Sequence, residues 1–292
     1  MADNPRELLE RYGLRPRRSL GQNFLIAPQV PERIVAGAEV GPEDTVLEVG
    51  AGVGTLTAAL AACAGRVIAV ETDGQLLDVL RDVLGAAPTV ELVHGDMLTL
   101  DPAALLGVAA PGAAPALWGP RLEHYLVVAN LPYYITAAVI RHLLEATVRP
   151  ARLVVTVQRE VAERMVAAPG ELSLLGVSIQ FYGKPRILFS LKRGAFFPAP
   201  AVDSAVVRLD LYETPPVTDC AVPLFFQVVR AGFAQKRKQL HNSLAATLAL
   251  SPAAVSVALA AVDVDPTLRA ETLSLEMWGR VARALAPLLN PA

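Results

Sequence analysis

The chain has 292 residues, of which 53% are hydrophobic and 18% are charged. This composition supplies ample apolar surface for a large core and excludes an intrinsically disordered chain. The longest uncharged stretch, residues 102–120, is broken by prolines and glycines, so it does not predict a membrane-spanning helix. A net charge of −2 gives no global indication of nucleic-acid binding. We expect a cytoplasmic protein that is not in a membrane, built of one large and one small domain.

Two short basic clusters stand out against this balanced charge. They consist of Arg15, Arg17 and Arg18 near the start and of Lys236, Arg237 and Lys238 near the end of the chain. A basic cluster of this length is usually a solvated surface, although it can also contact phosphate groups. The clusters alone therefore leave nucleic-acid binding open.

Six runs rich in valine, leucine and isoleucine predict buried strands. They span residues 45–50, 66–72, 90–96, 125–131, 152–158 and 204–212. Amphipathic segments such as 55–64 and 74–85 lie between them and predict helices. Strand–helix alternation is typical of an α/β fold with a doubly wound, mostly parallel sheet. Residues 187–212 contain no long helical pattern and predict an antiparallel pair that closes the sheet.

The proline-rich stretch 213–223 predicts a linker, and the chain after it has helical patterns only. We therefore expect an α/β domain over residues 1–214 and a small all-helical domain over residues 215–292. The two cysteines and four histidines lack the spacing of metal ligands, so we expect no metal site.

The first predicted strand ends in the glycine-rich sequence "VLEVGAGVGTLT". Gly50, Gly52 and Gly54 allow a tight turn and a close approach of a ligand to the backbone. Their G-x-G-x-G spacing differs from the G-x-G-x-x-G of dinucleotide sites, so an ordinary turn between strand and helix remains an alternative.

Two acidic residues strengthen the indication of a ligand site. Glu71 ends the second predicted strand about 20 residues past the glycines, where a carboxylate can hold ribose hydroxyls. Asp96 ends the third strand, beside the expected position of an adenine ring. Each acid alone could be a helix N-cap or a solvated strand end. Together with the glycines they form three features at the carboxyl edge of the sheet, where such folds bind ligands.

The fourth predicted strand ends in "NLPYY" at the same edge. The amide oxygen of Asn130 and the carbonyl oxygen of Leu131 can accept both protons of an exocyclic amine. Pro132 fixes the backbone and offers no competing N–H, and Tyr133 can stack on the ring of a base. The alternative is a turn capped by the asparagine, with both tyrosines packed into the core. Tyr134 has no assigned role, and packing suits it better than chemistry.

These motifs resemble those of the ribosomal RNA adenine N6-dimethyltransferases. The resemblance rests on "QNFL", "VLEVGAGVGTLT", "NLPYYI" and "FFPAPAVDSAVVRL" and extends over nearly the whole chain. It implies a Rossmann-like class I methyltransferase sheet with a helical C-terminal domain, and S-adenosyl-L-methionine as the cofactor. "DSAVVRL" and "AGFAQKRKQLHNSL" are more similar to the small-subunit enzymes. These dimethylate two adjacent adenosines in the 3′-terminal hairpin of 16S rRNA within an immature small ribosomal subunit.

The resemblance also implies a role for each matching residue. The cofactor would contact Gln22, Asn23 and Leu25 at its methionine end, the backbone of Gly50 and Gly52, Glu71 at its ribose, Asp96 and Met97 at its adenine, and Asn130. Asn130, Leu131, Pro132 and Tyr133 would clamp the target base. Phe196 would stack on the opposite face of that base, although the adjacent Phe197 leaves open which ring does so. The helical domain and the two basic clusters would grip the RNA.

Two other functions remain as alternatives. One is a 23S rRNA adenine N6-methyltransferase of the antibiotic-resistance type, and the other is a non-catalytic assembly or transcription factor of the same fold.

The spacer between residues 107 and 124 is longer than expected, and we predict a surface excursion near the active-site edge. We expect the protein to act as a monomer.

Overall fold

The computed structural model describes residues 4–108, 118–218 and 220–289, which form two compact units. The first comprises Met1–Ala162 and Arg186–Leu211, and the second comprises Glu163–Pro185 and Tyr212–Ala292. The predicted division between residues 214 and 215 lies close to Leu211. The sequence did not indicate that the earlier segment, Glu163–Pro185, groups with the helical unit.

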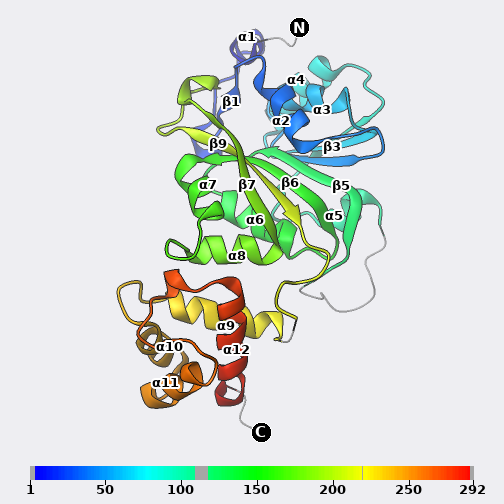
Figure 1. Ribbon diagram of the computed structural model, residues 1–292. Coiled ribbons are helices and arrows are strands. Elements are labelled where there is room, and N and C mark those ends of the chain that lie inside the picture. Colours follow the sequence, from blue (N-terminus) through cyan, green and yellow to red (C-terminus); the bar gives the residue numbers. More distant parts are fainter. Residues whose placement is uncertain (1–3, 109–117, 219, 290–292) are drawn as a thin grey trace. The chain divides into compact units, whose positions relative to one another are not determined.

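The secondary structure of the first unit alternates strands with helices (Figure 1). The strands are β1 (Phe24–Leu25), β2 (Thr45–Val49), β3 (Arg66–Glu71), β4 (Val90–His94), β5 (Arg121–Asn130), β6 (Arg149–Gln158), β7 (Gly183–Leu191), β8 (Phe196–Phe197) and β9 (Ser204–Leu211). The helices are α1 (Pro5–Arg11), α2 (Val30–Ala38), α3 (Thr55–Ala61), α4 (Gly74–Leu84), α5 (Pro102–Leu106), α6 (Thr136–Leu144) and α7 (Arg159–Val166), with short 3-10 turns η1 (Arg18–Leu20) and η2 (Arg193–Ala195).

Seven strands form the central sheet in the order β4-β3-β2-β5-β6-β9-β7. The pairs from β4 through to β6 are parallel, and β9 runs antiparallel to β6. The predicted doubly wound, mostly parallel sheet is therefore confirmed. The chain proceeds outward from β2 to β4 and then returns to place β5 on the other side of β2. This reversal creates a topological switch point between β2 and β5, where ligands bind at the carboxyl ends of the strands.

Both faces of the central strands are buried, which explains their unbroken valine-rich sequences. On β3, Val67 and Ala69 join a core cluster with residues of α2, α3 and α4, whereas the intervening Ile68 faces the opposite side and is also fully buried. Helix α6 packs against β6, and its buried residues are not part of that cluster. Helices therefore cover both faces of the sheet.

A two-stranded ribbon joins segments that are far apart in the sequence. Strand β1 pairs antiparallel with β8, with Phe24 opposite Phe197 and Leu25 opposite Phe196. The ribbon thereby connects "QNFL" to "FFPAP". This pairing could not be predicted from the sequence, because each strand has only two residues.

The described residues of the spacer before β5 do not lie at the active-site edge, so the expected position near that edge is wrong for them. At its start, Arg66, the first residue of β3, donates hydrogen bonds to the carbonyl oxygens of Leu105 and Leu106, each at 3.3 Å. At its end, Arg121–His124 form the first residues of β5. Both ends thus lie at the amino edge of the parallel sheet, opposite the switch point. Residues 109–117 lie outside the described residues.

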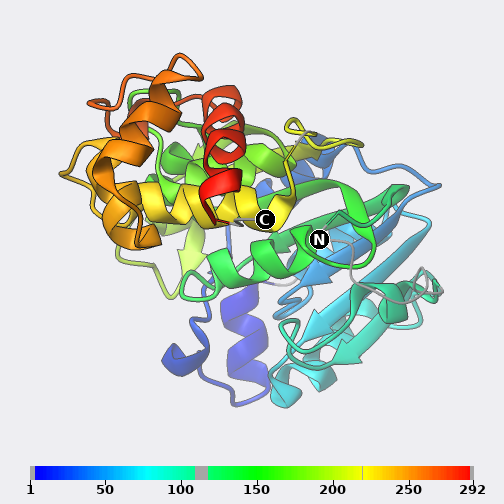
Figure 2. The same ribbon diagram turned by 90° about the horizontal axis from the view of Figure 1, so that it is seen from below.

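The second unit is built mainly of helices (Figures 1 and 2), together with the end of α7 and the first residues of β7. This confirms the helical character predicted for the C-terminal region. Its elements are α8 (Leu174–Tyr182), α9 (Val222–Phe233), α10 (Leu240–Leu248), α11 (Pro252–Ala260), η3 (Ala270–Thr272) and α12 (Leu275–Leu289). The ring of Phe181 on α8 lies 4.6 Å from that of Phe225 on α9. This aromatic packing explains why the segment around α8 belongs to the helical unit. In the described part of the chain, no helix is long and apolar enough to cross a membrane.

Candidate active site

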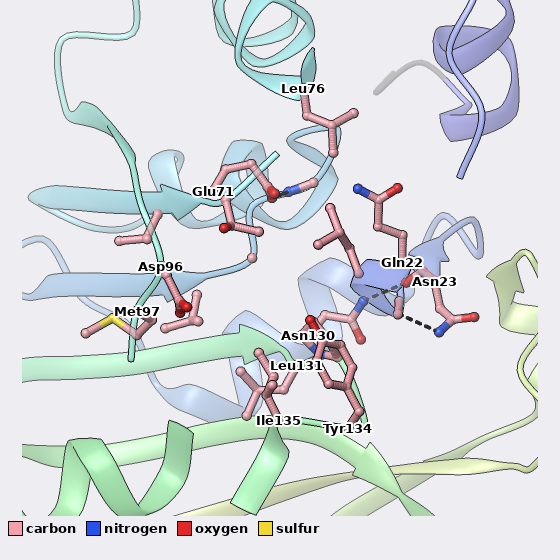
Figure 3. A pocket seen from close by; sticks show the side chains of 18 of the residues that line it. Gln22, Asn23, Glu71, Leu76, Asp96, Met97, Asn130, Leu131, Tyr134 and Ile135 are labelled. Atoms are coloured by element: carbon pink, nitrogen blue, oxygen red, sulfur yellow. Dashed lines mark hydrogen bonds between the residues drawn. The ribbon is translucent and has the colours of Figure 1, made fainter. Parts of the chain in front are cut away.

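A pocket of about 250 Å³ opens at the switch point of the sheet (Figure 3). The segments that follow β2, β3, β4 and β5 and the segment before β1 all contribute to its wall. The lining residues are Leu20, Gly21, Gln22, Asn23, Phe24, Val49, Gly50, Gly52, Val70, Glu71, Thr72, Leu76, Gly95, Asp96, Met97, Asn130, Leu131, Pro132, Tyr133, Tyr134 and Ile135. Most of the residues predicted from the sequence are therefore gathered around one cavity.

The glycine-rich loop after β2 is held in shape by backbone and carboxylate contacts. Gly50, Gly52 and Gly54 have φ angles of +78°, +61° and +85°, which favour glycine at each position. A side chain at Gly50 would project toward Asn130 O and Pro132 Cδ, both 3.9 Å from its Cβ. The absence of a side chain at this position therefore leaves room in the pocket for a ligand.

The carboxylate of Glu71 supports this loop from the end of β3. Its Oε2 accepts a hydrogen bond from Gly52 N and its Oε1 accepts one from Asp73 N, both at 2.8 Å. Only 6% of Glu71 is exposed, and burial raises its pKa although these backbone donors act in the opposite direction. Each oxygen keeps a second lone pair with which it can accept a hydroxyl group.

Asp96 and Met97 follow β4 on the same side of the pocket as Glu71, and Gln22 and Asn23 lie on the other side (Figure 3). Asp96 is exposed, and its Oδ1 accepts a hydrogen bond from Leu98 N at 2.9 Å. Met97 is only 3% exposed and offers an apolar surface. An acid beside an apolar wall suits a heterocyclic ring that carries an amine.

The "NLPYY" segment forms a fixed turn between β5 and α6. Asn130 Nδ2 donates to Asn23 O at 2.9 Å, so the side chain reaches across the pocket wall and does not cap the helix. Pro132 O accepts a bond from the Thr136 hydroxyl at 3.1 Å. The hydroxyl of Tyr133 lies 2.6 Å from Ser204 Oγ, and burial raises the pKa of this tyrosine. The turn is thus tied to three separate segments.

Tyr134 lies at the edge of the pocket, and its side chain is not packed into the core. It is 63% exposed and lines the cavity. A Cβ added at Gly21 would lie 2.9 Å from Tyr134 Cδ1, so the tyrosine ring rests on the glycine backbone. Its ring packs against the segment before β1, a contact that the sequence did not indicate.

Two predicted site residues do not reach this pocket. Phe196 is 1% exposed and Leu25 is 4% exposed, and both belong to the core cluster beneath the sheet. Because side chains alternate along a strand, the β1–β8 ribbon turns Phe24 and Phe197 to the opposite side. Phe24 lines the pocket, and the guanidinium of Arg6 lies 4.6 Å from the centre of the Phe197 ring. In this geometry Phe196 does not stack on a base, so that expectation is not met.

The residues of the two basic clusters differ in whether they form ion pairs. Arg17 forms an ion pair with Asp73, with Nη1 and Oδ1 3.1 Å apart, and its Nη2 donates to Gln75 Oε1 at 3.0 Å. Arg15 and Arg18 are exposed and form no ion pair with any described residue. Lys236, Arg237 and Lys238 are exposed between α9 and α10. No group of three or more histidine, cysteine or acidic side chains in the described ranges could hold a metal ion.

Comparison with known proteins identifies the kind of site. The family model described as "Ribosomal RNA adenine dimethylase" matches residues 13–286. The chain belongs to the ribosomal RNA adenine dimethylase family. Enzymes of this family are S-adenosylmethionine-dependent methyltransferases, and the observed sheet is of the class I type. The buried carboxylate of Glu71, the open space at Gly50 and the apolar wall at Met97 fit this cofactor.

Relatives within the adenine dimethylase family carry a more specific name. The chain is 43% identical to "Ribosomal RNA small subunit methyltransferase A" of Dehalococcoides mccartyi over 94% of this chain and 90% of the relative. It is 44% identical to the protein of that name from Pelotomaculum thermopropionicum, covering 95% of this chain and 94% of the relative. Among solved structures, the 23S rRNA methyltransferase ErmE matches with a TM-score of 0.69 and 28% identity over 90% of this chain and 99% of its own. A Plasmodium falciparum dimethyladenosine transferase matches in fold, with a TM-score of 0.73 and 23% identity over 90% of this chain and 97% of its own.

A buried acid lies directly beneath the glycine-rich loop. Glu48 is 1% exposed, and its Oε2 has no hydrogen-bond partner in the part of the chain that the structure describes. Burial, with a contribution from nearby Glu71, raises the pKa of Glu48 to about 8. The carboxyl group is therefore neutral in the folded protein at pH 7, whereas an unfolded glutamate is ionised there.

We predict that Glu48→Gln changes the pH dependence of stability. A carboxyl with a raised folded pKa contributes stability below its unfolded pKa of about 4.3 and loses this contribution as pH rises toward 8. The variant lacks this titration. Its free energy of unfolding should therefore rise relative to that of the wild type by up to about 1.4 kcal/mol per pH unit between pH 5 and 8. Urea unfolding at four pH values measures this difference, and Glu160→Gln, at an exposed site, is the control. Parallel profiles for wild type and Glu48→Gln would contradict the prediction.

Proposed function

We propose that this enzyme dimethylates N6 of two adjacent adenosines in the 3′-terminal hairpin of 16S rRNA, acting as a monomer on an immature small ribosomal subunit. The observation that carries the proposal is the position of "NLPYY" on the same pocket as the glycine-rich loop, Glu71 and Asp96. A turn that offers hydrogen-bond acceptors beside a cofactor pocket suits methyl transfer to an amine. The choice of the small subunit is supported by relatives of 42–44% identity, which carry that name.

The acceptor groups have a defined orientation. Because Asn130 donates its amide nitrogen to Asn23 O, its Oδ1 is the atom left to accept a proton from the target amine. The carbonyl oxygen of Leu131 supplies the second acceptor. The lone pair of an adenine amine is delocalised into the ring, which makes it a poor nucleophile. Binding both protons favours a pyramidal nitrogen whose lone pair points toward the methyl donor.

S-adenosylmethionine, when bound, supplies an activated methyl group on a sulfonium sulfur. Residues of this chain contribute alignment of the two partners and dipoles directed at the charge that develops on the amine. Glu71 and the glycine-rich loop would hold the ribose and methionine parts, and Asp96 and Met97 would hold the adenine. In this assignment the cofactor and the amine meet beside Asn130.

The amine proton has no evident protein acceptor in the described pocket. Glu71 ends β3 and Asp96 follows β4, whereas the clamp begins with the last residue of β5. The remaining titratable groups of the pocket are Tyr133 and Tyr134. Burial raises the pKa of Tyr133, against the opposing effect of its Ser204 contact, so its hydroxyl stays protonated and cannot take up the proton. We therefore propose that the proton passes to water after methyl transfer. The second methylation then proceeds with one N–H left for the two acceptors.

The substrate adenosine must leave its stack before it reaches this pocket, which costs a few kcal/mol. Tyr133 would compensate by stacking on the extruded ring. Positive charge at Arg15, Arg18 and the Lys236–Lys238 cluster supports contact with RNA phosphates. These contacts do not read sequence, so the position of the hairpin in the subunit would select the target.

The 28% identity to a 23S rRNA methyltransferase makes large-subunit RNA the second candidate substrate. Purified enzyme should transfer labelled methyl groups to small-subunit particles from cells that lack this dimethylation, and mass spectrometry should place them on two adjacent adenosines. Protein-free 23S rRNA should accept at least tenfold fewer. The reverse preference would exclude the small-subunit assignment, and cofactor binding without transfer to either RNA would favour a non-catalytic factor.

For Asn130→Ala we predict loss of methyl transfer, because the substitution removes one of the two acceptors for the amine. Cofactor affinity should fall less than about tenfold, the scale of one polar contact. Single-turnover transfer and calorimetric binding of S-adenosylhomocysteine measure the two effects. For Glu71→Ala we expect the main effect to be a loss of cofactor affinity, because this carboxylate would hold the ribose. Normal dimethylation by Asn130→Ala would refute the clamp.

Two substitutions at Tyr133 separate its ring from its hydroxyl. Tyr133→Phe removes only the bond to Ser204 and should lower transfer less than about fivefold, the scale of a neutral hydrogen bond. Tyr133→Ala removes a stacking contact worth about 1–3 kcal/mol and should lower transfer by a larger factor. Initial rates at subsaturating RNA test this order. Equal rates for the two variants would show that the ring does not stack on the substrate.

A further inference from the structure

We infer that Arg17 is a positioning residue for the cofactor pocket and not an RNA contact. Arg17 begins a segment, residues 17–23, that contains η1 and leads into β1 and that we name the strap. Its residues Leu20, Gly21, Gln22 and Asn23 form one wall of the pocket. The contacts that fix the strap in position therefore affect the shape of the cofactor site.

Both oxygens of one buried carboxylate hold the strap. Asp73, which is 4% exposed, receives Arg17 Nη1 on Oδ1 at 3.1 Å and Gln22 Nε2 on Oδ2 at 2.9 Å. Arg17 N also donates to Gln22 Oε1 at 2.8 Å, which closes the group of three side chains. Because Asp73 is buried, loss of its cationic partner would leave a carboxylate poorly compensated.

Asp73 continues the network to the residues that hold the glycine-rich loop. Its backbone N–H donates to Glu71 Oε1, and Glu71 Oε2 accepts from Gly52 N, both at 2.8 Å. Its Oδ1 also caps the N-terminus of α4 through Gln75 N at 3.2 Å. A continuous chain of hydrogen bonds thus runs from Arg17 to the cofactor-facing loop.

The other end of the strap contacts the substrate clamp. Asn23 O accepts the amide hydrogen of Asn130, and Gly21, at φ +60°, lies against the ring of Tyr134. The strap thereby connects Asp73 to the "NLPYY" turn through hydrogen bonds and ring packing. All three arginines are exposed, Arg17 with 47% of its side chain accessible, but only Arg17 has an ion-pair partner among the described residues. Arg15 and Arg18 are therefore the ones free to contact phosphate.

The decisive comparison is Arg17→Met against Arg81→Met, an exposed arginine on α4 with 62% of its side chain accessible. In the absence of RNA, Arg17→Met should weaken S-adenosylhomocysteine binding about tenfold, mainly through faster dissociation, because the strap wall loosens. Arg81→Met should retain wild-type affinity. Calorimetry gives the affinity, displacement kinetics give the dissociation rate, and hydrogen exchange should show faster exchange in residues 17–23.

A double-mutant cycle with Asp73→Asn tests the partner. Each single change should weaken cofactor binding, and the double variant should be no weaker than Asp73→Asn alone, since the two residues act through one contact. Arg17→Lys should recover part of the affinity by keeping the charge. This variant also keeps the test decisive if Arg17→Met is too unstable to measure.

The RNA measurement distinguishes the two roles of the basic cluster and rests on the proposed function. With cofactor-free protein and the 16S terminal hairpin, Arg17→Met should bind within about twofold of wild type, whereas Arg18→Met should bind more weakly and with a smaller salt slope. Unchanged cofactor affinity in Arg17→Met, or a loss of RNA affinity in its cofactor-free form, overturns the inference. The cofactor result stands or falls without reference to which RNA is methylated.

Discussion

The arrangement of the site depends on the carboxylate of Glu71. One oxygen fixes the glycine-rich loop through Gly52 N, and the other fixes the start of α4 through Asp73 N. Burying this carboxyl is unfavourable, as its raised pKa indicates, and the backbone donors offset part of that cost. The carboxylate therefore stabilises the fold in the absence of a ligand. A ligand that adds hydroxyl donors to the same oxygens would complete an environment that is already mostly built.

The parallel sheet brings the other strand ends of the site to the same edge as this carboxylate. Strands β2, β3, β4 and β5 end at one edge, so the residues that follow them converge at the switch point. This explains why strand ends found in the sequence could be combined into a site. The positions of Gly50, Glu71, Asp96 and Asn130 required only the strand assignments and the parallel topology.

Features that depend on pairing between distant segments could not be predicted in the same way. The β1–β8 ribbon decides that Phe24 faces the pocket and Phe196 the core, and a two-residue strand has no periodicity from which to infer its register. Likewise, Arg17 looked equivalent to Arg15 and Arg18 in sequence, because its partner Asp73 lies on another element. The helix α8 groups with the second unit through aromatic contacts with α9, which composition alone does not indicate.

The hydrogen bond from Asn130 to Asn23 couples the cofactor pocket to the substrate clamp. It makes one peptide carbonyl part of both the cofactor wall and the substrate clamp. Orientation of Oδ1 toward the amine therefore requires the strap to be in place, since a free amide could rotate and present its nitrogen instead. A displaced strap would both open the cofactor wall and misdirect an acceptor. Because Asp73 holds the strap through Arg17 and Gln22, a residue that faces neither reactant influences the geometry at both.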